Sequence, residues 1–203
     1  GSYLRPVVEK YGLDKNIQRG RIYRIVHEST ERRKKPQMLK APISELVDTL
    51  SHPNGWWRDM AQKLIVVRQD RGAVSALKSL AESGGSPLGR LHAMWPLEGL
   101  GVLDTDLILK KMQDPDARVR AAVVRLCEPE LLKRNTALLA AIKPLASDAD
   151  IDVAIQVVLS MAYTGVEGGD ELVEAANAGH PSSEAMSRIT KIGHARLVDA
   201  KRR

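Results

Sequence analysis

The chain has 203 residues, of which 43% are hydrophobic and 28% are charged, a composition typical of a folded globular protein rather than a disordered chain. Only 3% of the residues are aromatic and Phe is absent, which disfavours an all-β sandwich or barrel. The single cysteine, Cys127, excludes an internal disulfide framework and a cysteine-rich metal site, and no apolar run is long enough to predict a membrane span.

The net charge of +6 is concentrated at the two ends of the chain. Residues 1–40 carry eleven Lys and Arg against four Asp and Glu, and residues 185–203 carry six against one. The residues between them carry fourteen basic and twenty acidic side chains, so the central body is acidic. This distribution favours solvated basic ends over a basic nucleic-acid-binding face, with phosphate binding by the ends as the alternative.

Residues 1–37 are predicted to form an extended segment followed by a basic linker. The run GRIYRIV at 20–26 is entered through a glycine and is rich in β-branched and aromatic residues, which predicts one short strand. One strand cannot satisfy its own backbone hydrogen bonds, so we expect its partner to come from an upstream domain or another chain.

From residue 43 onward, apolar residues recur at helical spacing in short helices that alternate with longer ones. Prolines stand at or just before three of the helix starts, where a missing N–H costs little, and Asp114 and Asp148 are predicted to cap two of the helices. The longer helices are predicted over about residues 55–70, 87–101, 116–127 and 150–163.

An internal repeat aligns the longer helices on Arg58, Arg90 and Arg120, and a fourth unit is placed 32 residues later, at Asp152. A two-helix unit of this length cannot bury its own apolar face and must stack on its neighbours. The sequence therefore predicts an all-α fold of the α-α superhelix class, a HEAT-like solenoid with about four repeats over residues 38–165. Small residues are expected where helices approach closely: Ala61, Ala93, Ala122 and Ala154.

Residues 166–203 are predicted to form a turn-rich connection and a C-terminal capping helix. Ser182 and Ser183 stand at its expected start, and apolar residues follow at helical spacing to about residue 200. A basic amphipathic helix can touch membranes or acidic partners, but a terminal capping helix needs only one apolar face.

The stretch DPDARVRAA at 114–122 resembles the core signature of HEAT repeats. This resemblance implies that Asp114 and Arg120 take part in a ladder between stacked repeats. The other units depart from the signature, because His52 and Gly84 stand at the aspartate position and Asp152 replaces the arginine.

A narrower resemblance involves four stretches. YGLD at 11–14 and RGRIYRIV at 19–26 resemble the last strand of a sugar-dehydrogenase-type β-propeller, and HPNGWWRD at 52–59 and RLHAMWPLEGL at 90–100 resemble the HEAT region that follows it. The family comprises large bacterial secreted or membrane-associated dehydrogenase-like proteins, with a propeller, HEAT repeats and often a c-type haem domain. The resemblance implies these upstream and downstream domains as partners in the same polypeptide, and a periplasmic or secreted location. Because the haem attachment signature is absent from this chain, we expect no cofactor on it.

Two aromatic positions are candidates for binding. For Trp56 and Trp57, we expect one ring to pack beneath the preceding helix and the other on the joint between repeats; the alternative is an exposed anchor for a partner. His92 and Trp95 fall on a helix that is apolar almost all round, where a histidine is more often a hydrogen-bonded core residue than a ligand or base.

The three aligned arginines, Arg58, Arg90 and Arg120, have two interpretations. They form either a ladder to carboxylates and carbonyls between repeats, or a row of donors on a concave face for an acidic partner. Cys127 lies beside Glu128 and is predicted to be a buried filler rather than a nucleophile. The remaining histidines lack metal-ligand spacing, and no phosphate-binding loop or catalytic triad is apparent.

The sequence therefore favours a non-catalytic scaffold or protein-interaction module within a larger dehydrogenase-like protein. We expect it to be a monomer, or a dimer that forms because truncation exposes its strand and its open end. The alternative is a nucleic-acid-binding HEAT-like protein related in architecture to DNA-repair glycosylases, which predicts a basic concave face. A third hypothesis, an enzyme that holds a redox cofactor through His92, Trp95 and the methionines, predicts visible absorbance.

Overall fold

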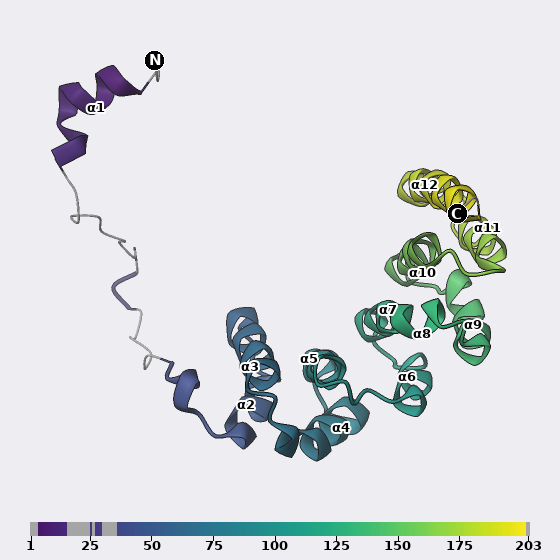
Figure 1. The fold of residues 1–203 in the computed structure, drawn as a ribbon, viewed down its shortest axis with the longest axis horizontal. Coiled ribbons are helices and arrows are strands. Elements are labelled where there is room, and N and C mark those ends of the chain that lie inside the picture. The colour runs from purple at the N-terminus through teal and green to yellow at the C-terminus, as the bar shows by residue number, and fades with distance from the viewer. Residues whose placement is uncertain (1–3, 16–24, 26, 30–35, 202–203) are drawn as a thin grey trace. The chain divides into compact units, whose positions relative to one another are not determined.

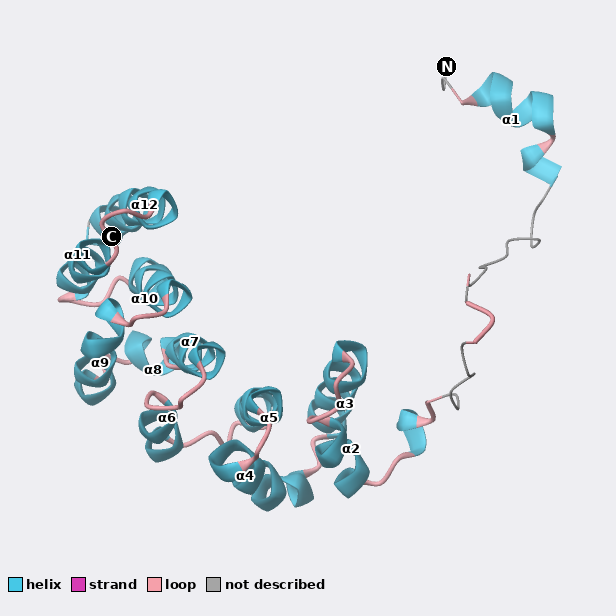
Figure 2. Ribbon diagram, turned by 180° about the vertical axis from the view of Figure 1, so that it is seen from behind, coloured by secondary structure: helices cyan, strands magenta, loops and turns pink. Residues whose placement is uncertain are grey.

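The computed structural model describes residues 4–15, 25, 27–29 and 36–201. Throughout these residues the regular structure is helical, and no strand is present among them (Figures 1 and 2). The prediction of an all-α fold is confirmed at this level. The chain divides into two compact units, Gly1–Pro36 and Gln37–Arg203.

The first unit contains a helix where the sequence predicted extended chain. α1 (Arg5–Tyr11) begins with Pro6 in its first turn, where the missing N–H has no helical partner to lose, and a 3-10 helix follows at Leu13–Lys15. Gly12 ends α1 in the left-handed conformation, with φ 59°, and its N–H bonds to the last turn. The predicted strand at 20–26 lies outside the described residues, apart from the single position Ile25.

The second unit alternates shorter and longer helices. The shorter ones are α2 (Ile43–Thr49), α4 (Val74–Ser83), α6 (Thr105–Lys111), α8 (Glu128–Leu132), α9 (Thr136–Ile142) and α11 (Gly169–Gly179). The set that we call the longer helices is α3 (Gly55–Arg68), α5 (Pro87–Gly99), α7 (Ala117–Leu126), α10 (Ile151–Thr164) and α12 (Glu184–Lys201). α7 is included for its place in the alternation, although with 10 residues it is no longer than α4. Short 3-10 helices lie at Met38–Lys40, Arg71–Ala73 and Lys143–Ser147.

The longer helices of the second unit pack against one another in chain order. α3 contacts α5, α5 contacts α7, α7 contacts α10 and α10 contacts α12, while each of α3, α5 and α7 also contacts the shorter helix before it. Figures 1 and 2 show the longer helices side by side in one layer and the shorter helices in a second layer beside it. Contacts therefore join neighbours in the sequence rather than distant segments.

Side-chain caps fix where four of the longer helices begin. Asn54, Ser86, Asp116 and Asp150 each accept a hydrogen bond from a backbone N–H in the first turn of the helix that follows. The caps are therefore Asp116 and Asp150, two residues after the predicted positions Asp114 and Asp148.

The caps also set the register of the repeat. The fourth residue of the helix is Arg58 in α3, Arg90 in α5 and Arg120 in α7, but Ala154 in α10. Asp152 lies two residues earlier and donates its backbone N–H to the Asp150 cap. The fourth unit is thus shifted by two residues from the predicted alignment on Asp152.

A continuous apolar core lies between the two layers of the second unit. Ala61, Ala93 and Ala154 are fully buried, as expected for close helix contacts, whereas Ala122 is half-buried and the neighbouring Val123 is buried instead. The largest fully buried side chains come from both layers: Leu46, Leu50, Ile65, Leu77, Met94, Leu97, Leu131, Leu138, Ile142, Met161 and Met186.

Candidate interaction site at the N-termini of the longer helices

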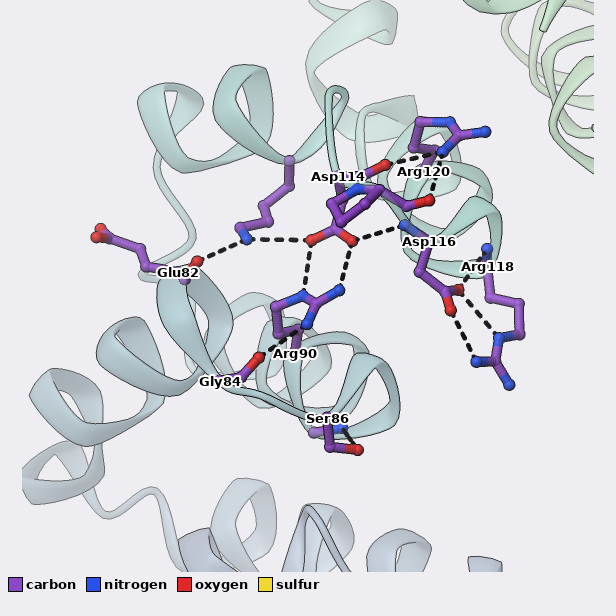
Figure 3. A network of polar contacts seen from close by, with 11 residues as sticks. Glu82, Gly84, Ser86, Arg90, Asp114, Asp116, Arg118 and Arg120 are labelled. Carbon is purple, nitrogen blue, oxygen red and sulfur yellow. Dashed lines mark hydrogen bonds and ion pairs between the residues drawn. The ribbon is translucent and has the colours of Figure 1, made fainter. Parts of the chain in front are cut away.

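The N-terminal turn of α5 is joined to the loop before α7 by a buried ion pair. Arg90 donates from Nε to Asp114 Oδ2 at 2.8 Å and from Nη2 to Asp114 Oδ1 at 2.7 Å (Figure 3). The third guanidinium nitrogen, Nη1, donates to the carbonyl of Gly84 at 2.8 Å. Lys111 Nζ bonds to Asp114 Oδ2 and to the carbonyl of Glu82. Two predicted residues, Arg90 and Asp114, are therefore direct partners.

A second ion pair of the same form joins α7 to the loop before α10. Arg120 donates from Nε and Nη2 to the two carboxylate oxygens of Asp148, at 2.8 and 2.7 Å. Its Nη1 donates to the backbone carbonyl of Asp114 at 2.8 Å. Arg120 therefore contacts the backbone carbonyl of Asp114, whereas the carboxylates of Asp114 and Asp148 bind the arginine of the preceding longer helix. We call each such arginine with its carboxylate and carbonyl partners a rung.

The first rung lacks a carboxylate. Arg58 in α3 donates from Nη1 to the carbonyls of His52 and Pro53, at 2.7 and 3.0 Å. Its Nε is buried and has no hydrogen-bond partner, alone among the buried side-chain nitrogens and oxygens of the described residues. The residue that corresponds to Asp114 and Asp148 here is Gly84, which has no side chain.

The loops before α7 and α10 hold the carboxylates in position. Asp114 Oδ1 accepts the backbone N–H of Asp116, and Asp148 Oδ1 accepts the backbone N–H of Asp150. Each aspartate therefore orders its own loop while it binds the neighbouring arginine. In the fourth unit, Ala154 stands where the earlier units have their arginine. His180 Nε2 lies 2.9 Å from the backbone carbonyl of Asp148, which is the carbonyl that an arginine at position 154 would contact.

Both carboxylates stay charged at neutral pH. Hydrogen bonding from Arg120 lowers the pKa of Asp148. Burial by itself would raise the pKa of Asp114, but hydrogen bonds from Arg90, the Asp116 backbone and Lys111 together bring it below its usual range. The same pairs raise the pKa of Arg90 and of Arg120. The charged partners of each pair therefore hold a longer helix to the loop that follows it in space.

The two neighbouring tryptophans occupy different environments. Trp57 is half-buried and stacks on His52, with ring centroids 4.9 Å apart and an angle of 21° between the rings. Trp56 meets Trp57 edge-on at 6.1 Å and is 51% exposed. The structure thus places Trp57 against the core, and leaves Trp56 available for contact with another molecule.

His92 and Trp95 lie in α5 and are both half-buried. His92 Nδ1 is 3.1 Å from Gln62 Oε1 in α3 and 3.9 Å from a carboxylate oxygen of Asp59. Burial lowers the pKa of His92, and the positive charge of Arg58 lowers this pKa further. The ring is therefore neutral at pH 7. The histidine therefore serves as a hydrogen-bonding group between two longer helices.

Other chemically reactive groups are few among the described residues. Cys127 is buried, and burial together with the Glu128 charge raises its thiol pKa to about 12. Across the part of the chain that the structure describes, no group of three or more His, Cys, Asp or Glu side chains could hold a metal ion. None of the helices described is both long enough and apolar enough to cross a membrane.

Comparisons of the chain with protein-family models, with curated proteins and with solved structures each give no match. The resemblance to HEAT repeats and to dehydrogenase-like proteins therefore remains a prediction from sequence motifs.

Proposed function

We propose that residues 37–203 form a HEAT-like α-α superhelix that acts as a non-catalytic scaffold for protein–protein interaction. The observation that carries this proposal is the repeated rung. Arg90 and Arg120 occupy the same position in successive longer helices. Each binds an aspartate of the next repeat through Nε and Nη2, and donates from Nη1 to the backbone carbonyl six residues earlier. A contact that recurs between successive units is the device of a stacked repeat, in which each unit is stabilised by its neighbours.

The layer of longer helices supplies a surface suited to a protein partner. Trp56 and Val67 in α3 and Leu159 and Tyr163 in α10 are large apolar side chains that remain exposed. Val67 and Tyr163 each stand thirteen residues after the cap of their helix, so they extend the same edge of the layer. Exposed Trp and Tyr are enriched where partner proteins bind most tightly.

We propose further that this scaffold belongs to a larger dehydrogenase-like protein. The support is the likeness of residues 11–14, 19–26, 52–59 and 90–100 to such proteins. On this account an upstream propeller-like domain and a downstream c-type haem domain are its partners in a periplasmic or secreted polypeptide. Any redox chemistry of that polypeptide would belong to those other domains.

A nucleic-acid-binding function has less support. Phosphate binding requires guanidinium and ammonium groups that are free to replace counterions. Arg90, Lys111 and Arg120 are engaged with aspartates inside the second unit. Two of the three recurring arginines, Arg90 and Arg120, are therefore unavailable as part of a basic stripe.

The proposal is tested by capture experiments with the full chain as bait. A separately expressed propeller-like domain should be retained, and Trp56→Ala should weaken its retention about tenfold, as expected for an exposed aromatic anchor. Leu39→Ala is the matched control, because Leu39 is also exposed but lies outside the longer helices. Failure to retain that domain, together with salt-sensitive retention of DNA or RNA, would overturn the proposal in favour of nucleic-acid binding.

A further inference from the structure

We propose that Arg58 is a binding site for an aspartate or glutamate carboxylate of a partner protein. The inference rests on the proposed scaffold function and names the chemistry by which the partner is recognised. The partner's carboxylate would complete the first rung, as Asp114 and Asp148 complete the second and third rungs from within the chain.

The geometry of the other rungs defines what the Arg58 guanidinium is oriented to bind. In all three rungs Nη1 donates to the carbonyl six residues earlier, at His52, Gly84 and Asp114 respectively. At Arg90 and Arg120 the edge formed by Nε and Nη2 then faces the next repeat, and in this proposal the matching Nη1 contact gives Arg58 the same orientation. At Arg90 and Arg120 this edge holds both oxygens of a carboxylate at 2.7 to 2.8 Å. A planar fork of this kind matches a carboxylate far better than it matches a neutral acceptor.

Nothing in the described chain supplies this carboxylate to Arg58. Gly84 stands where Asp114 and Asp148 stand in the later repeats, and a Cβ on Gly84 would lie 2.6 Å from the backbone oxygen of Leu80. The chain therefore has no room for an aspartate at this position without moving α4. The remaining donors of Arg58, Nε and Nη2, have no hydrogen-bond partner among the described residues.

The surroundings of Arg58 favour a protein partner. A buried guanidinium nitrogen without a partner costs free energy, so a ligand that satisfies it gains more than it would at a hydrated arginine. Arg58 as a whole is half-buried, so part of its side chain is open to solvent, while Nε is covered and must be uncovered by a small movement when a carboxylate binds. Trp56 lies in the same first turn of α3, is 51% exposed and offers an apolar surface to a protein partner.

Nuclear magnetic resonance of the side-chain Nε–Hε group tests the proposal on the full chain. The probe is a blocked hexapeptide of alternating Asp and Ala, and the control peptide has Asn at each Asp. We expect the Arg58 Hε signal to shift saturably with the acidic peptide only, while the signals of Arg90 and Arg120, already paired, stay in place. No shift at Arg58, an equal shift with the Asn peptide, or an equal shift with inorganic phosphate would overturn the inference.

Two variants extend the test. Arg58→Lys keeps the charge but removes the fork, and should weaken binding of the acidic peptide about tenfold, the loss expected for a hydrogen bond to a charged group. Lys63→Gln removes an exposed charge from the same helix and should leave binding unchanged. If Arg58→Lys still retains the propeller-like domain with full affinity, the carboxylate site is refuted while the scaffold function stands.

Discussion

At the scale of single residues, the aspartates before α7 and α10 combine two tasks. Each orders its own loop by accepting a backbone N–H, and binds the arginine of the preceding longer helix through both oxygens. The sequence motif identifies Asp114 and Arg120 as members of a ladder, but it does not reveal that their side chains bind different partners. The role of Asp148 in the third rung is likewise hidden, because its position before a helix also suits a cap.

Removal of one rung carboxylate should be costly. Asp148→Asn takes away the charge that opposes the partly buried Arg120, and we expect the free energy of unfolding to fall by about 2 kcal/mol. Asp48→Asn, an exposed carboxylate at the end of α2, should change it by less than about 0.5 kcal/mol. Urea unfolding followed by circular dichroism measures both. Equal, small effects in the two variants would show that the rung contributes nothing to stability.

The rungs also predict how stability depends on pH. The pKa of Asp114 and of Asp148 is lower in the folded chain than the usual value of 3.8, so the unfolded chain takes up protons first as the solution is acidified. The contribution of the rungs is therefore complete above about pH 5 and is lost as the pH falls below 4. Urea midpoints at pH 6, 4 and 3 should fall steeply for the natural chain and less steeply for Asp148→Asn. Parallel curves would contradict this origin of the acid sensitivity.

At the scale of elements, periodicity predicts the longer helices well because each carries apolar residues at helical spacing and has a clear start. It places the fourth unit two residues early, since no arginine remains in α10 and Asp152 is the only charged residue near the expected spacing. The side-chain caps Asn54, Ser86, Asp116 and Asp150 carry the register more faithfully than the arginines do. The helix α1 was not predicted, because none of its residues is buried and it lacks an apolar stripe.

The close contact of α5 with its neighbours gives a direct test of helix register. Ala93 is fully buried, so Ala93→Arg forces a charge into the packed core and should lower the free energy of unfolding by several kcal/mol. Glu98→Arg introduces the same side chain at an exposed position of α5 and serves as the control. A melting temperature unchanged by Ala93→Arg would show that this face of α5 does not point inward.

At the scale of the whole second unit, composition and repeat length predict its helical class. They do not predict which rung lacks its carboxylate, because that depends on Gly84 opposite Arg58. Composition and repeat length do not identify the partner either, because its recognition depends on the same local arrangement around Arg58. The sequence alignment already places Gly84 at the aspartate position, but only the structure shows that the carboxylate missing there would have bound Arg58 of the preceding longer helix.

The central claim, that residues 37–203 are a stack stabilised between neighbouring repeats, is tested most directly by hydrogen exchange of a variant weakened at one end. Met186 is fully buried in α12, and Met186→Ala should cost about 2–5 kcal/mol there. Because α12 packs on α10 and α11, the account predicts faster amide exchange in α10, α11 and α12, with α3 and α5 unchanged. An equal increase in every helix from α2 to α12 would contradict the stack and indicate one indivisible core.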